Sequence, residues 1–151
     1  MKHKGIRIVL FVLEIFVALG AIAGGIALLS GVFAQGIPLA WMQGTPFNDY
    51  TIPGLILAIV IGGGMSVAAV TVFIQREWAV LISAVAGICM VGFEVVEAAS
   101  VDSKAGNGLL IVLGFQAFYF VLGLVIFGLA ASLWMKEYRD QHAPIRHASH
   151  A

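Results

Sequence analysis

Long apolar segments, separated by short polar stretches, dominate the sequence. Four of them hold about 20 or more mostly apolar residues, the length that crosses a hydrocarbon core of about 30 Å as a helix. These segments run over residues 6–29, 52–74, 79–99 and 109–133. Each is continuously apolar, whereas the strands of a membrane barrel alternate between polar and apolar positions. The pattern therefore predicts an all-α membrane protein, a bundle of four transmembrane helices.

The remaining residues are too few for a second domain. We expect residues 1–135 to form a single four-helix transmembrane domain and residues 136–151 to form a polar cytoplasmic tail. The composition agrees, because 61% of the 151 residues are hydrophobic and 11% are charged, against roughly 45–50% and about 25% in soluble domains. A chain of this length cannot bury so much apolar surface internally, so its expected partner is the lipid bilayer.

Lysine and arginine gather at one set of predicted helix ends. They lie before the first span, between the second and third and after the fourth: Lys2, Lys4, Arg7, Arg76, Lys136, Arg139 and Arg146. The loops over residues 30–51 and 100–108 contain only Lys104. Because these charges are retained on the cytoplasmic side, we expect a multi-pass protein of the bacterial cytoplasmic (inner) membrane with both termini in the cytoplasm.

The loop that follows the first span is unusually hydrophobic. Its stretch "GIPLAWMQG" is too short to cross a bilayer and is centred on Trp41, whose ring favours the headgroup level. Three structures fit this pattern: a lid over the bundle, an interfacial turn of helix or a shallow re-entrant segment. In each of them the bundle carries a hydrophobic outer loop between its first and second helices, with Trp41 as a candidate functional residue.

The stretch "TPFNDYTIPG" leads into the second span. Thr45 and Pro46 fit the N-cap and first position of a helix, because the hydroxyl accepts from a free amide and proline has no amide to leave unpaired. A second start is available at Thr51, so we expect a short helical turn and then the spanning helix. Asp49 and Tyr50 lie at this junction, as a cap and an interface anchor or, alternatively, with Asp49 as a ligand contact.

One carboxylate, Glu14, interrupts the apolar run of the first span in "LFVLEIFVAL". It lies about 12 Å into the span at helical rise. Ser66 of the second span lies at a comparable depth, so we expect Glu14 to face the interior with Ser66 as its hydrogen-bond partner. A charged acid at the bilayer centre costs about 2.5–3.5 kcal/mol. A protonated, hydrogen-bonded carboxyl group in a helix interface avoids that cost.

The third span carries Glu94 and Glu97, which share one helix face. Glu97 is close enough to the outer end to reach water, whereas Glu94 lies deeper, about 8 Å from Ala99. Gln116 of the fourth span falls near that level, and Tyr119 is one turn further in. We expect Glu94, Gln116 and Tyr119 to form a polar cluster in the outer half of the bundle.

Glycines allow the predicted helices to approach one another. Hydrophobicity gives little drive between helices in lipid, so small residues that permit close packing matter. Gly20 and Gly24 form a GxxxG motif that Gly25 extends, and residues 62–64 are all glycine. We expect these surfaces to pack against other helices of the same bundle, with a homodimer as the alternative.

Three segments carry a family resemblance: "LEIFVALGAIAGGIALL", "GIPLAWMQGTPFNDYTIPGLIL" and "QAFYFVLGL". They resemble an uncharacterised family of small bacterial four-helix integral membrane proteins, which implies the fold but no established reaction. The motif "VLEI" is also similar to the first helix of small multidrug-resistance transporters, which carry a membrane-embedded Glu there. Those transporters have minimal loops, so the long first loop and the strong charge bias of this chain disfavour that family.

Other classes lack their sequence signatures. The chain contains no P-loop, dinucleotide-binding glycine motif or HExxH motif, and its formal net charge of +0 gives no basic nucleic-acid footprint. Cys89 is the single cysteine, and all histidines lie in the terminal segments: His3, His142, His147 and His150. We therefore expect no enzyme, no cofactor, no metal site and no nucleic-acid partner.

Two kinds of function remain. The first is a structural, accessory or interaction role, with a membrane-protein partner or a second copy of the chain. The alternative is a small proton-coupled transporter that uses Glu14 and Glu94 and whose small-molecule substrate the sequence does not indicate.

Overall fold

The computed structural model describes residues 3–32, 38–76, 78–100 and 109–141, and in these it contains helices and turns. Helical segments long and apolar enough to cross a membrane are Lys4–Leu29, Thr51–Phe73, Ala79–Ala99 and Val112–Arg139. They coincide with the four predicted spans. The described part of the chain is therefore an all-α structure compatible with a multi-pass membrane protein.

The first span is a single helix, α1 (Lys4–Leu29). Its buried residues recur at helical spacing and form one face toward the bundle: Leu10, Glu14, Val17, Ala18, Ala21 and Gly25. The helix ends at Ser30, whose N–H donates to the carbonyl of Ile26 at 2.8 Å. Gly31 then adopts a φ of 73°, which glycine reaches without strain and which turns the chain out of the helix.

The second span joins three helical parts without a break: α2 (Thr51–Leu55), the π-helical segment η3 (Ile56–Gly63) and α3 (Gly64–Phe73). π-helical turns are rare and concentrate at functional sites. Because the i→i+5 bonding of η3 widens the turn, the 3.6-residue spacing of α2 does not continue in phase into α3. The direction in which a residue of α3 faces therefore cannot be obtained by counting from the start of the span.

The third and fourth spans, α4 (Ala79–Ser100) and α5 (Leu109–Gln141), pack closely as a pair. A Cβ built on Gly87 of α4 would lie 2.9 Å from the carbonyl oxygen of Gly123 of α5, and the reverse distance is 3.1 Å. Only glycine permits this approach. Helix α5 continues to Gln141 instead of ending near residue 133, so residues 136–141 of the predicted tail are helical. Residues 142–151 of that tail lie outside the described residues.

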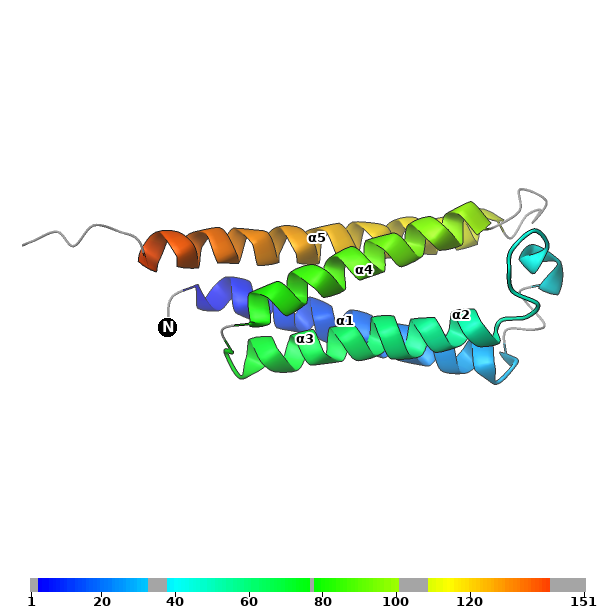
Figure 1. The fold of residues 1–151 in the computed structure, drawn as a ribbon, viewed down its shortest axis with the longest axis horizontal. Coiled ribbons are helices and arrows are strands. Elements are labelled where there is room, and N and C mark those ends of the chain that lie inside the picture. The colour runs from blue at the N-terminus through cyan, green and yellow to red at the C-terminus, as the bar shows by residue number, and fades with distance from the viewer. Residues whose placement is uncertain (1–2, 33–37, 77, 101–108, 142–151) are drawn as a thin grey trace, which may run out of the picture.

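The four spans form two helical hairpins, which Figure 1 shows side by side. Helix α1 packs along α2, η3 and α3, and α4 packs along α5. The hairpins meet mainly through α3 with α4 and through α1 with α5. At the end of the bundle where α1 begins, Nη2 of Arg7 donates to Oε1 of Glu137 at 2.6 Å and ties α1 to α5.

Glycines bring α1 against the second span, which agrees with the expectation that they pack against other helices of the same bundle. A Cβ on Gly25 would lie 2.6 Å from the carbonyl oxygen of Gly54. A Cβ on Gly62 would lie 2.6 Å from the side chain of Ile22. Elsewhere in the glycine run the prediction was too broad, because no described atom lies within 4 Å of a Cβ built on Gly63. The close contact is therefore made by selected glycines, within one bundle.

The loop before the second span contains a short 3-10 turn, η2 (Leu39–Met42), which includes Trp41. Tyr50 ties this turn to the start of the second span, because its hydroxyl donates to the carbonyl of Pro38 at 3.0 Å. Residues 33–37 lie outside the described part of the chain. The described loop thus contains a turn of helix, one of the three predicted structures, and its position at the membrane interface stays a prediction.

Thr45 and Pro46 do not begin a helix. The hydroxyl of Thr45 donates to the carbonyl of Met42 at 2.8 Å and accepts from the N–H of Phe47 at 3.2 Å. This local turn uses the side chain that a helix cap would have needed. The predicted short helix at this point is therefore wrong, and the second span begins at Thr51.

Candidate intramembrane polar site

Four polar side chains are buried among the described parts of the spans: Glu14 (0% exposed), Ser83 (0%), Glu94 (6%) and Gln116 (6%). The acids and Gln116 were expected from the sequence, but Ser83 was missed. A signal for it existed, because Ser83 continues the helical repeat of small and apolar residues that α4 buries: Ala79, Val80, Ala86, Gly87 and Met90. The buried polar residues thus occupy core positions.

The inner part of the site brings together Glu14 of α1 and Ser83 of α4. The Ser83 hydroxyl lies beside the Glu14 carboxyl group, although no hydrogen bond of standard geometry joins them. Among the described residues, the two carboxyl oxygens of Glu14 and the hydroxyl of Ser83 all lack a hydrogen-bond partner. A fully buried acid with unmade hydrogen bonds is costly, and in native proteins such a group calls for a specific explanation.

Ser66 is not the partner of Glu14. Its hydroxyl donates to the carbonyl of Gly62 on its own helix at 2.8 Å. The sequence predicts similar depths for Ser66 and Glu14, but depth does not tell in which direction a side chain points. The π-helical segment η3 also shifts the helical phase of the second span before Ser66. The predicted hydrogen bond between Glu14 and Ser66 is therefore wrong, and Ser83 is the neighbouring hydroxyl.

The outer part of the site contains Glu94, Glu97 and Gln116. Glu97 lies close enough to interact with each of the other two, and it is exposed, as expected from its position. Within the described residues the amide of Gln116 makes no hydrogen bond of standard geometry. Tyr119, the expected third member of the cluster, packs instead against Gly20 of α1, with its hydroxyl 2.8 Å from the position of a Cβ. Direct contact between Glu94 and Gln116 stays a prediction.

The buried side chains of α4 between the two parts of the site are apolar. The helical rise from Ser83 to Glu94 along α4 is about 16 Å. The buried α4 side chains between them include Ala86 and Met90, which can neither accept nor pass on a proton. The α4 side chains therefore provide no proton relay between Glu14 and Glu94 along this helix.

A cleft of about 400 Å³ lies between the second span and α4, in the half of the bundle nearest the η2 loop. Its walls are mostly apolar, with Val60 and Phe93 among them, and oxygen-bearing side chains come from Thr45, Tyr50 and Glu97. No lysine or arginine is among the described residues that line it. Apolar walls with a carboxylate and without a cation favour a ligand that is itself apolar and positively charged.

Asp49 and Tyr50 fix the start of the second span. Oδ1 of Asp49 accepts from the N–H of Thr51 at 2.8 Å, which is the capping role expected for it. This hydrogen bond holds the pKa of Asp49 below its ordinary value. Burial, and secondly the nearby Glu97 carboxylate, raise the pKa of Tyr50 above its ordinary value. Tyr50 thus lies near Glu97 as well as beside the loop.

The Asp49 cap gives the fold a pH dependence. Because the pKa of Asp49 is lower in the folded state, its stabilisation is present above the ordinary Asp pKa of about 3.9 and is lost as the pH falls through the lower folded value. Asp49→Asn keeps a capping oxygen but does not titrate. We expect the wild type to have the higher Tm in detergent at neutral pH, and the difference in Tm to begin to shrink as the pH falls below about 4. A difference in Tm that is constant with pH would contradict an ionised cap.

The described residues contain no group of three or more His, Cys, Asp or Glu arranged to hold a metal ion. Comparison of the chain with known protein families, with curated proteins and with solved structures finds no match. The case for a function therefore rests on the buried polar residues and the cleft.

Proposed function

We propose that the protein is a small integral protein of the bacterial cytoplasmic membrane, with both termini in the cytoplasm, that exchanges protons for lipophilic cations. The observation that carries the proposal is Glu14, which is 0% exposed and whose carboxyl oxygens both lack a hydrogen-bond partner in the described structure. Glu14 binds the proton, and Glu94 and Glu97 attract the cation.

An acid retained for packing would make hydrogen bonds that offset the cost of its burial. The sequence suggested such a role for Glu14, with Ser66 as its partner, but Ser66 is bonded to its own helix. An ionisable side chain that lies inside a span without a hydrogen bond of standard geometry supports a function in proton or ion movement. The unpaired hydroxyl of Ser83 adds a group that can stabilise the charged or the protonated form of Glu14.

The cleft supports the choice of substrate. Its volume of about 400 Å³ lies in the range of small-molecule sites. A cation with aromatic or aliphatic groups would bury those groups against residues such as Phe93 and would place its charge near Glu97. Glu94 lies close to Glu97, so the cation would also reduce the repulsion between two neighbouring acids.

Exchange requires that the two parts of the site are used in different conformations. They lie about 16 Å apart along α4, and the buried α4 side chains between them are apolar. The Arg7–Glu137 ion pair joins the hairpins at the end where α1 begins, whereas the cleft opens between them at the other end. Separation of the hairpins at opposite ends in turn would expose first the outer acids and then Glu14.

Purified protein in liposomes that enclose a pH-sensitive dye tests the proposal. When ethidium, an aromatic cation, is added outside acid-loaded vesicles, we expect the internal pH to rise as the cation enters in exchange for protons. Glu14→Gln keeps the size and polarity of the side chain but cannot exchange a proton. Its ethidium-dependent pH change is expected to fall to the level of protein-free liposomes.

Ser66→Ala is the matched control. It removes a hydroxyl group at a depth comparable to that of Glu14, and this hydroxyl is hydrogen-bonded to its own helix. Its exchange rate is expected to equal that of the wild type. Cys89 lines the cleft and adds a binding measurement, since bound ethidium should slow its alkylation by N-ethylmaleimide. Exchange at the wild-type rate by Glu14→Gln, or no exchange by the wild type, would contradict the proposal.

A structural or accessory role is the second candidate, and one observation favours it. Helix α5 is the least buried of the four spans, and no described atom lies within 4 Å of a Cβ built on Gly114 or Gly128. Outward-facing glycines permit close helix contact in lipid, so a partner membrane protein or a second copy of the chain could pack there. A specific cross-linked complex through α5, with exchange absent, would favour this role.

A further inference from the structure

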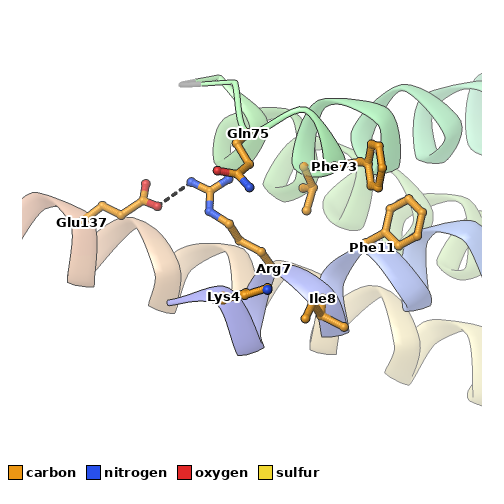
Figure 2. Close-up of a pocket in the computed structure, with 8 residues that line it drawn as sticks. Lys4, Arg7, Ile8, Phe11, Phe73, Gln75 and Glu137 are labelled. Atoms are coloured by element: carbon orange, nitrogen blue, oxygen red, sulfur yellow. Dashed lines mark hydrogen bonds and ion pairs between the residues drawn. The ribbon is translucent and has the colours of Figure 1, made fainter. Parts of the chain in front are cut away.

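A second pocket, of about 440 Å³, lies at the end of the bundle where α1 begins. Figure 2 shows that side chains from α1, the end of α3 and α5 surround it. On α1 the pocket is lined by Lys4, Arg7, Ile8 and Phe11, whose spacing places them along one face of the helix. The pocket therefore follows α1 for about 10 Å, from Lys4 to Phe11.

The lining changes from charged to apolar along this length. Lys4, Arg7 and Glu137 form its polar end, whereas Phe11 and Phe73 lie deeper along the helices, with ring centroids 5.4 Å apart. Phe73 is 69% exposed, so the apolar wall is continuous with the surface that faces lipid. The order of groups matches a phospholipid, which has a polar head at the membrane boundary and a hydrocarbon chain below it.

Arg7 has unused hydrogen-bonding capacity at this pocket. Nη2 donates to Glu137 at 2.6 Å, whereas Nη1 is buried and makes no hydrogen bond within the described part of the chain. Lys4 adds an ammonium group with three donors. Two cations against one carboxylate leave the lining with a net positive charge. Phosphate oxygens are strong acceptors for arginine and lysine.

We propose that this pocket binds the phosphate group of an anionic phospholipid, with Lys4 and Arg7 as donors and an acyl chain along Phe11 and Phe73. Basic pockets between spans on the cytoplasmic side bind such headgroups, and the charge bias predicts that this end of the bundle faces that side. The lipid phosphate offsets the net positive charge of the lining and holds the junction of the two hairpins. The site is separate from Glu14 and the cleft, so it does not depend on the proposed exchange.

Native mass spectrometry of the purified protein in detergent tests the site, with phosphatidylglycerol as the probe. The wild type is expected to retain one phosphatidylglycerol at concentrations at which phosphatidylcholine is not retained. Lys4 is exposed, so Lys4→Gln should fold normally and should weaken retention about fivefold, the effect of one basic residue near an anionic lipid. Lys136→Gln removes the same charge from the same end of the bundle, but Lys136 does not line the pocket. Its retention of the lipid is expected to be unchanged.

Several results would overturn the proposal. Equal weakening by Lys4→Gln and Lys136→Gln would mean general attraction to a basic surface, and unchanged retention by Lys4→Gln would exclude the pocket. Equal retention of the two lipids would mean contact with hydrocarbon alone. Displacement of the lipid by an equal concentration of inorganic phosphate would assign the pocket to a soluble anion. The Tm of each variant without lipid verifies that both are folded.

Discussion

Gly25→Ala is expected to destabilise the bundle strongly. The new Cβ would lie 2.6 Å from the Cβ of Ala58 and 2.6 Å from the carbonyl oxygen of Gly54, closer than such atoms approach. One of these atoms belongs to the backbone, so α1 and the second span must move apart. Overpacking of this kind costs about 1–3 kcal/mol. The fraction of protein that stays monodisperse after heating in detergent should fall well below that of the wild type.

Gly63→Ala provides the matched control for this experiment. It makes the same chemical change within a span, but no described atom lies within 4 Å of its Cβ. Alanine also favours a helix more than glycine does, by about 1 kcal/mol in water. We expect this variant to be as stable as the wild type or slightly more stable. Equal losses in the two variants would mean that the close approach at Gly25 does not hold the hairpin together.

Glu14→Met is expected to raise the thermal stability of the protein and to abolish proton exchange. Methionine fills a similar volume and has no unpaired polar atoms of its own, and removal of an unsatisfied buried polar group is worth about 1–3 kcal/mol. A gain in Tm combined with loss of exchange is the result expected where a costly residue is kept for function. The Tm in detergent and the liposome assay measure the two effects.

Glu14→Gln separates the loss of proton exchange from the gain in thermal stability. It also lacks exchange, but its amide remains polar and unpaired, so no comparable gain in Tm is expected. If Glu14→Met were instead less stable than the wild type, Glu14 would have to make stabilising hydrogen bonds in the membrane. That outcome would favour the structural role over exchange.

The spans and the burial of the acids could be predicted from the sequence, because both depend on local composition. A run of about 20 apolar residues is long enough to cross a membrane as a helix, and an acid within such a run favours the interior of the bundle. Glu14 and Glu94 were found in this way, and the glycines of α1 were correctly expected to contact other helices of the bundle. These properties require no knowledge of how one helix is rotated against another.

The partners of the buried residues could not be predicted, because they depend on that rotation. Ser66 and Ser83 both lie in apolar helices, but the hydroxyl beside Glu14 is that of Ser83, whereas Ser66 donates to its own helix. The π-helical segment that precedes Ser66 changes the helical phase of the second span and leaves no clear mark in the sequence. The C-terminal extension of α5 was missed for a related reason. Because Glu137 is polar, the sequence predicts that it belongs to the tail, whereas its ion pair with Arg7 holds it against α1.

The division into two hairpins bears on how the chain is made. Each hairpin contains its own tight glycine contact, at Gly25 with Gly54 in the first and at Gly87 with Gly123 in the second. Helices that are already inserted associate through such packing, so the first hairpin can assemble before the second has left the ribosome. The ion pair between Arg7 and Glu137 can form only after α5 has been synthesised. This division favours a biogenesis in which two separately formed hairpins dock, with the Arg7–Glu137 contact between α1 and α5 made after both have formed.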